Sequence, residues 1–339
     1  DGGRGIPRPP FPIASGRLRG MVGTYMGRYI LRRLIAFIPT LIIVSFLIFI
    51  MIYLIPGDPV SMMLGAEASA TEADELRRQL GLDQPFLGRM KTWYSGAVRG
   101  DLGHSLFLHQ PVTSALLERL PVTLSLTFCA LMISATIGIT AGVIASLRQG
   151  KFTDWGIMLL AIIGISIPIF WLALNMIFLF SVRLGWFPTG GYSPISEGLG
   201  SFLKHLFLPS LALGLAYTAL IARMSRSSML EVLRQDYVRT ARAKGLRDRG
   251  VILVHAMRNA LIPIVTILGL TVGELLAGSV ITETVFNLPG VGRLVIDAVK
   301  RRDYPVVQGG ILIITFTYLC VNLLVDLVYG WIDPRIRYS

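Results

Sequence analysis

The sequence contains few charged residues for its length, since only 15% of its 339 residues are Asp, Glu, Lys or Arg. A soluble domain carries about a quarter. Cysteine is also scarce, and both Cys129 and Cys320 lie within apolar runs, which predicts packing roles. The low charge excludes an ordinary soluble protein, and the two cysteines do not indicate a disulfide framework.

Motifs for bond chemistry are missing as well. No glycine-rich loop ends in Gly-Lys-Ser/Thr, because Phe152 follows Gly150 and Lys151, and no His-Glu-x-x-His zinc motif occurs. Gly290 and Gly292 form a glycine pair that no predicted strand precedes, so this pair does not indicate a nucleotide site. We therefore predict that the chain is not an enzyme and holds no cofactor or metal of its own.

The apolar residues, in contrast, come in long runs. Four runs without a charge are each long enough for a helix that crosses a bilayer, which needs about 20 residues. These are residues 34–56, 120–147, 155–182 and 306–325. Two weaker runs follow the same pattern, at residues 206–222 and 260–282. The sequence predicts an all-α polytopic membrane protein with six transmembrane helices.

The net charge of +12 is distributed unevenly among the segments between these runs. The N-terminal arm, the tail and residues 148–154 and 223–258 together hold 20 Lys and Arg, whereas the three intervening segments hold ten. This bias predicts that both termini and residues 223–258 are cytoplasmic. No loop interleaves aromatic with basic residues, so nucleic acid is not an expected partner.

The polar segments define the expected organisation. Residues 1–25 are rich in Gly, Pro and Arg, and we expect them to be disordered or to be an added or upstream-start segment. Residues 57–118 are expected to form a small external subdomain after a helix stop at 56–59. Within it, Thr71 and Asp74 predict a capping box that opens a short helix ending near Leu80 and Gly81.

Small residues recur along two of the predicted spans. Ser134, Gly138, Gly142 and Ser146 are spaced four residues apart, and Gly269, Gly273 and Ala277 repeat the pattern. Such stripes allow two helix backbones to approach closely. Pro168 and Pro263 are expected to kink their helices. These features favour a packed helical bundle.

Glu274 interrupts the apolar run 260–282. An ionisable group inside the bilayer costs about 2.5–3.5 kcal/mol, so this carboxylate is expected to face protein or water inside the bundle. Two interpretations remain open. Glu274 either belongs to a substrate or ion pathway, or it pairs with an arginine or a neighbouring helix.

The loop 223–258 is basic yet patterned. Leu230, Leu233, Tyr237 and Ala241 fall on one face of a predicted amphipathic helix. Lys244 and Gly245 would end this helix with a basic last turn and a glycine stop, and a second helix is predicted from Asp248. An amphipathic helix outside the membrane predicts docking on a partner protein.

Several stretches resemble one family of membrane proteins. DYVRTARAKGL at 236–246 with HAMRNALIP at 255–263 resembles the cytoplasmic EAA loop of ABC-importer permeases, in particular the first permease subunit of dipeptide, oligopeptide and nickel importers. Arg239-Thr240-Ala241 stands where Glu-Ala-Ala is usual. Further matching stretches are PGDP at 56–59, GLDQP at 81–85, GDLGHS at 100–105, ETVFNLPGVGRL at 283–294, RRDYPVVQG at 301–309, and NLLVDLVYG with DPRIRY at the tail.

The resemblance implies a type I ABC-importer permease fold over residues 26–338, in the inner membrane, with a cytoplasmic coupling loop at 227–258. It implies a second, homologous permease subunit, two cytoplasmic ATPase subunits that bind ATP and Mg, and an external solute-binding protein. The ATPase-coupling residues would then be Leu233, Tyr237, Ala241, Lys244 and Gly245. Independently of the resemblance, the position of Glu274 in an apolar run makes it the candidate for the substrate pathway.

Two questions stay open at this stage. The substrate is expected to be a di- or oligopeptide, although glutathione, nickel chelates, glycosides and opines are carried by the same permease type. The alternative function is an ion-coupled secondary transporter, which would ordinarily show an inverted repeat and paired polar groups within the membrane. Glu274 alone supports that alternative only weakly.

Overall fold

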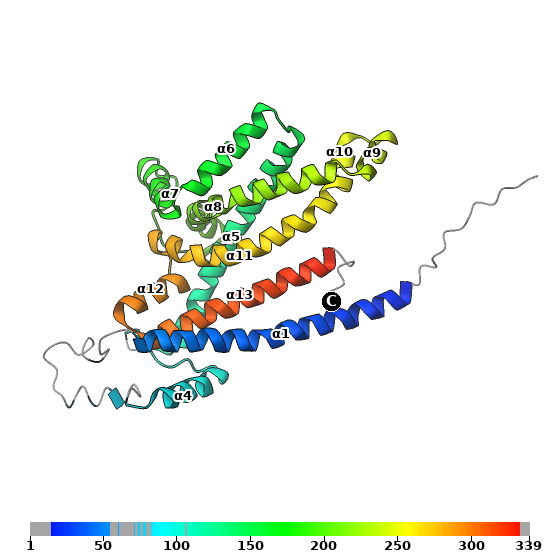
Figure 1. The fold of residues 1–339 in the computed structure, drawn as a ribbon. Helices are drawn as coiled ribbons and strands as arrows, with labels where there is room; N and C mark the ends of the chain where they lie inside the picture. The colour runs from blue at the N-terminus through cyan, green and yellow to red at the C-terminus, as the bar shows by residue number, and fades with distance from the viewer. Residues whose placement is uncertain are drawn as a thin grey trace, which may run out of the picture.

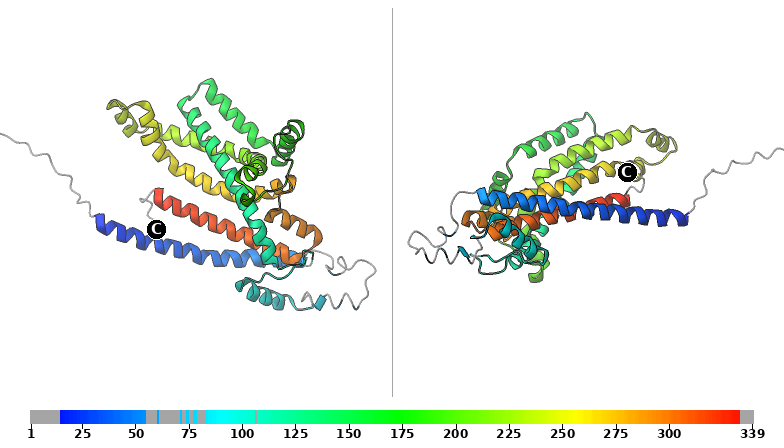
Figure 2. Two further views of the ribbon diagram at one scale, coloured as in Figure 1. Left: turned by 180° about the vertical axis from the view of Figure 1, so that it is seen from behind. Right: turned by 60° about the horizontal axis from the view of Figure 1, so that its bottom comes forward.

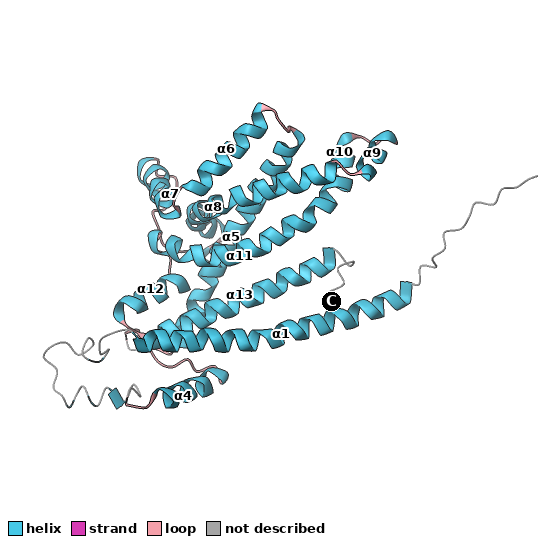
Figure 3. Ribbon diagram, viewed as in Figure 1, coloured by secondary structure: helices cyan, strands magenta, loops and turns pink. Residues whose placement is uncertain are grey.

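The computed structural model describes residues 15–54, 83–105 and 107–332, with single positions at 60, 71, 74, 77 and 78. Within these residues the chain is helical, and no β-strand occurs beyond an isolated bridge between His104 and Pro111 (Figure 3). The predicted helix stop at 56–59, and most of the short helix predicted from Thr71 to Leu80, fall outside them. The fold class is all-α, as predicted.

Five of the described helices are long and apolar enough to cross a membrane, and a bent pair raises the number to as many as six. The five are α1 (Ser15–Leu54), α5 (Val112–Leu147), α8 (Leu199–Leu233), α11 (Met257–Val285) and α13 (Tyr304–Ile332). α1 begins at Ser15, within the N-terminal arm that the sequence analysis places at residues 1–25. The prolines of the N-terminal arm end at Pro12, and none prevents the helix from extending back to Ser15.

The predicted span 155–182 is two helical segments. α6 (Phe152–Ser166) is followed by α7 (Ile169–Met176) and the π-helix η1 (Ile177–Arg183), and the two parts are bent by 100°. Ile167 is extended, with φ −84° and ψ 122°, because the residue before a proline is pushed out of the helical region. Pro168 therefore breaks this segment, whereas Pro263 lies within the uninterrupted α11.

The remaining helices lie at the two ends of the bundle. α4 (Phe86–Val98) and α12 (Val291–Arg301) lie near the C-terminal end of α1, whereas α9 (Asp236–Ala243) and α10 (Asp248–Gly250) lie at the opposite end (Figures 1 and 2). The N-terminal end of α1 and the C-terminal end of α13 lie toward the same end as α9. The π-helix η3 (Val251–Ala256) joins α10 to α11, and the 3-10 turn η2 (Ile195–Glu197) precedes α8.

The small-residue stripes mark the closest helix contacts. α5 packs along α8, where a Cβ on Gly138 would lie 2.8 Å from the Ile221 side chain and one on Gly142 would collide with the Ala222 carbonyl oxygen. On α11, a Cβ at Gly269 would collide with Val325 of α13. The α5 stripe therefore packs as predicted, because the missing side chains allow α5 and α8 to approach closely, whereas only Gly269 and Gly273 of the α11 stripe are close-packed and Ala277 is exposed.

Candidate functional site

The loop that joins α8 to α11 is a pair of short helices rather than one continuous amphipathic helix. α8 ends at Leu233, and Gln235 is extended, with φ −71° and ψ 149°, before α9 begins at Asp236. The predicted single face from Leu230 to Ala241 is therefore wrong. The sequence pattern is helical on both sides of this turn, so the pattern did not reveal the change of direction.

The buried face of α9 consists of Val238 and Ala241. Val238 is fully buried and Ala241 is 8% exposed, and both pack against Val251 of η3 with Leu233 beside them. Tyr237 instead lies on the outer side and is 41% exposed. The structure thus brings Leu233 and Ala241 together, adds Val238, and turns Tyr237 outward. Once the helix starts at Asp236, the three-residue spacing of Val238 and Ala241 identifies this face.

Gly245 ends α9 as predicted, with the positive φ of +80° that favours glycine. The Gly245 N–H donates to the Arg242 carbonyl at 2.9 Å, and the Leu246 N–H donates to the Ala241 carbonyl at 3.4 Å. This pair of bonds is a Schellman motif, which satisfies carbonyls at the end of the helix. A second helical segment begins at Asp248, also as predicted.

Two polar contacts fix α9 to the following segment. Asn259 Nδ2 donates to the Tyr237 hydroxyl at 2.7 Å, and Arg242 Nε lies 3.4 Å from Asp248 Oδ1. The outer surface of this region, which we call the α9 surface, is basic but also carries exposed apolar side chains. Its exposed residues include Tyr237, Arg239, Arg242, Lys244, Leu246, Leu253 and Val254.

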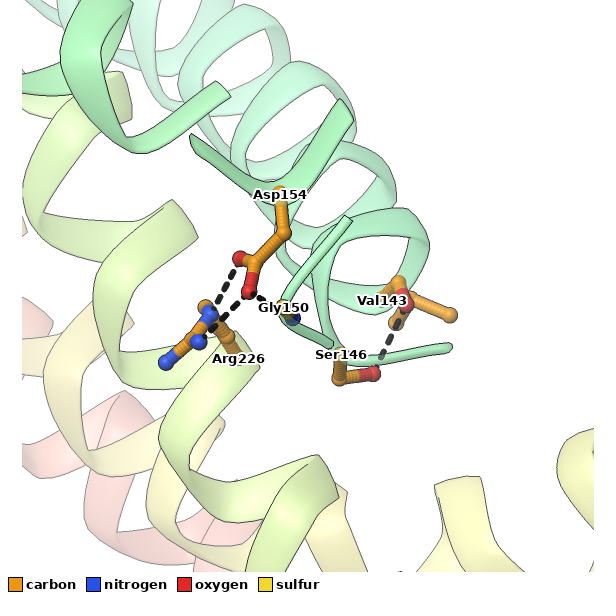
Figure 4. Close-up of polar contacts among 5 residues, drawn as sticks. All are labelled: Val143, Ser146, Gly150, Asp154 and Arg226. Atoms are coloured by element: carbon orange, nitrogen blue, oxygen red, sulfur yellow. Dashed lines mark hydrogen bonds and ion pairs between the residues drawn. The ribbon is translucent and has the colours of Figure 1, made fainter. Parts of the chain in front are cut away.

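An ion pair between a buried aspartate and a partly exposed arginine connects α6 to α8. Arg226 Nε donates to Asp154 Oδ1 at 2.6 Å and Arg226 Nη2 donates to Oδ2 at 2.8 Å, while the Gly150 N–H donates to Oδ2 at 3.0 Å (Figure 4). Asp154 is 4% exposed. This bidentate pair holds the start of α6 against the helix that leads directly into α9. The sequence analysis missed it because nothing local links residues 72 positions apart.

Glu274 lies on the outer face of α11 in this chain. Its neighbours Leu275 and Leu276 are buried, whereas Leu270 and Ile281, on the same face as Glu274, are 58% and 44% exposed. Glu274 is therefore exposed in this single chain, because Leu275 and Leu276 occupy the inward positions of α11, and its place in a substrate pathway stays a prediction. Among the described residues, no arginine or other side chain bonds its carboxylate.

Glu283, in the last turn of α11, is a fully buried carboxylate that the sequence analysis also missed. Thr123 Oγ1 donates to Glu283 Oε1 at 2.7 Å, and the Arg293 N–H at the start of α12 donates to Oε2 at 2.9 Å. A Cβ at Gly290 would collide with this carboxylate. The glycine pair at Gly290 and Gly292 thus makes room for an anion of the chain itself, at a helix N-terminus.

Comparisons with known proteins agree on one family. The model of the family "binding-protein-dependent transport system inner membrane component" matches residues 138–338, and the model of the N-terminal domain of such membrane components matches residues 26–127. The di/tripeptide transport system permease protein DppB of Pseudomonas aeruginosa (strain UCBPP-PA14) is 47% identical over 333 residues, which cover 92% of this chain and 99% of DppB.

Other relatives are similar over as much of the chain. The glutathione transport system permease protein GsiC of Escherichia coli O6:H1 and a putative peptide transport system permease protein of Brucella abortus (strain 2308) are each 44% identical, over 93% of this chain and 100% of their own length. Among solved structures, two inward-facing forms of the MetNI methionine ABC transporter match with TM-scores of 0.55 and 0.52 at 18% identity. They cover 65% and 64% of this chain and 96% of the matched chains, which supports the fold alone.

Proposed function

Because the chain belongs to the family of inner membrane components of binding-protein-dependent transport systems, we propose that it carries di- or oligopeptides across the inner membrane as one half of an ATP-driven importer. The names of its relatives support this substrate class, since they include di/tripeptide, peptide and glutathione permeases. Glutathione is the second candidate substrate. None of these findings favours an ion-coupled transporter.

The α9 surface is the feature that carries the proposal. Alternating access requires two states, and moving their balance from 1:99 to 99:1 takes about 5.5 kcal/mol of differential binding. The sequence has no nucleotide-binding loop, so that free energy has to enter through a contact with a partner. Basic residues beside exposed Tyr237, Leu246 and Val254 suit docking on two cytoplasmic ATPase subunits that bind ATP and Mg.

Glu274 belongs, in this proposal, to the substrate pathway between this chain and a homologous second permease subunit. Its carboxylate is exposed on an apolar helix, and an uncompensated charge facing lipid would cost about 2.5–3.5 kcal/mol. A water-filled pathway removes that cost. An external solute-binding protein would deliver the substrate at the end of the bundle that carries α4 and α12, with both termini on the cytoplasmic side.

Purification from the native membrane tests the proposed assembly. We expect the tagged chain to co-purify with a second permease and two ATPase subunits, and Ala241→Asp to lose the ATPases because the new charge is buried under α9. Ser95→Asp is the control, since Ser95 is exposed on α4 at the opposite end of the bundle, away from the α9 surface. Isolation of the wild-type chain without ATPases, or equal ATPase recovery with both variants, would contradict the assignment of α9.

A further inference from the structure

The outer face of α6 is apolar and exposed, whereas the opposite face is buried against the bundle. α6 lies at the edge of the bundle away from α1 and packs on α5 and α8 (Figures 1 and 2). Asp154 points inward to Arg226 of α8, as Figure 4 shows. On the other side, Phe152, Trp155 and Leu159 follow at helical spacing and are 91%, 71% and 59% exposed. A continuous apolar stripe of this kind marks a surface that a membrane or a partner covers.

The apolar stripe ends where basic residues begin. Trp155 opens the uncharged run 155–182, and tryptophan is enriched at the boundary between lipid and water. Arg148 and Lys151 come just before this run, in the turn that joins α5 to α6, and both are exposed. The turn lies toward the α9 end of the bundle, because Arg226, which bonds the start of α6, is two turns before the end of α8. The two cations are therefore at the level of the lipid headgroups, and the stripe is at the level of the acyl chains.

The turn itself holds the two cations close together. The Lys151 N–H donates to the Arg148 carbonyl at 3.0 Å, which closes a four-residue turn, and Gly150 takes the positive φ of +74° within it. The first and last Cα atoms of such a turn lie within about 7 Å of each other. A single phosphate can therefore contact both side chains.

No carboxylate of this turn neutralises Arg148 and Lys151. Asp154 is the only acidic residue between positions 148 and 155, and both of its oxygens are bonded already, by Arg226 and by the Gly150 N–H. Within the residues that the structure describes, no ion pair includes Arg148 or Lys151. The turn thus carries two uncompensated positive charges beside an apolar stripe.

We propose that the turn at residues 148–151 binds the phosphate of an anionic phospholipid, such as phosphatidylglycerol, in the leaflet on the α9 side. The acyl chains lie along Phe152, Trp155 and Leu159. Basic sites beside membrane helices attract anionic headgroups, and aromatic side chains anchor at the same level. A cytoplasmic ATPase subunit would be the alternative occupant of the turn. The stripe, however, continues past Leu159 to Ile163 within the apolar run, where a protein outside the membrane cannot follow it.

Fluorescence quenching tests the site on the full-length chain, purified with the subunits that accompany it, in phosphatidylcholine nanodiscs. A small fraction of the lipid is replaced by brominated phosphatidylglycerol or, in parallel, by brominated phosphatidylcholine. The Trp155 signal is the difference between the unmodified protein and Trp155→Phe. We expect Trp155 to be quenched at a lower fraction of brominated phosphatidylglycerol than of brominated phosphatidylcholine. Arg148→Gln and Lys151→Gln should each raise the phosphatidylglycerol fraction needed by about fivefold, whereas Lys151→Arg should not. Arg183→Gln is the matched control, an exposed arginine at the other end of the bent pair.

Three results would overturn the proposal. These are equal quenching of Trp155 by the two brominated lipids, unchanged phosphatidylglycerol quenching in either glutamine variant, and no quenching by either lipid, which is the result if an ATPase subunit covers the turn. The substituted side chains are all exposed, so the variants remove no buried contact and should fold. Failure of this site would leave the importer proposal intact, because co-purification of the ATPases does not depend on it.

Discussion

Replacing Gly245 by valine strains the backbone at one position, and the free-energy cost of this substitution follows from the φ angle there. Gly245 has φ +80°, and an L-residue in the left-handed region costs about 1–2 kcal/mol, with a β-branched side chain among the worst choices. A Cβ at this position would meet no atom within 4 Å, so the backbone strain alone sets the cost within this chain. That cost lowers the population of the native turn by about 5- to 30-fold relative to its alternatives.

The assay compares Gly245→Val with Gly250→Val in the assembled transporter. Gly250 is equally open but has φ −67°, an ordinary helical value, so its valine variant controls for the added side chain. We expect both variants to insert into the membrane, since no span is changed. Only Gly245→Val should lose ATPase recovery and substrate-stimulated ATP hydrolysis. Equal behaviour of the two variants would refute the argument that this turn positions α9.

Four further outcomes are expected. Asp154→Ala should lower the free energy of unfolding by about 1–3 kcal/mol, because the substitution leaves the Arg226 guanidinium without its bidentate partner. The loss should be measured as a lower Tm, and an unchanged Tm would contradict the role given to this ion pair. Glu283→Gln should keep more stability than Glu283→Ala, since only the amide retains an acceptor for Thr123, and equal Tm values for the two would count against it. Burial raises the pKa of the Asp303 carboxyl above its ordinary value of 3.8, so the folded chain binds the carboxyl proton more tightly than the unfolded chain, and this contribution to stability is lost as the pH rises through the folded pKa. The difference in Tm between Asp303→Asn and wild type should therefore be more positive at neutral pH than near pH 4. The opposite trend would exclude burial of Asp303 as a source of pH-dependent stability. Single cysteines at the exposed positions Ser95 and Thr240 should label from opposite sides of sealed cells, and labelling of both from outside would contradict the topology.

The sequence predicted the parts of the fold that depend on local pattern. Apolar runs located the spanning helices, small-residue spacing located the α5–α8 contact at Gly138 and Gly142, and the Lys244-Gly245 signal located the end of α9. The angle at Pro168 was not predictable, because a proline marks a break but does not by itself determine the size of the 100° bend.

The candidate site was also predictable only in part, because its contacts depend on more than local sequence pattern. Val238 and the break at Gln235 depend on where α9 begins, and the apolar pattern continues across that point. The partners of Glu283 and Asp154 are far away in sequence, so no local spacing links Thr123 to Glu283 or Arg226 to Asp154. Glu274 lies outward because α11 buries its other faces, which a single helix pattern does not reveal.

Uptake by proteoliposomes tests the central claim most directly. The chain is reconstituted with the subunits that co-purify with it, and uptake of a labelled dipeptide is measured with ATP enclosed on the α9 side and the solute-binding protein added on the other. The account predicts uptake that requires both ATP and the binding protein and that falls to background with Gly245→Val. Uptake by the chain alone, driven by an imposed proton gradient without ATP, would contradict it.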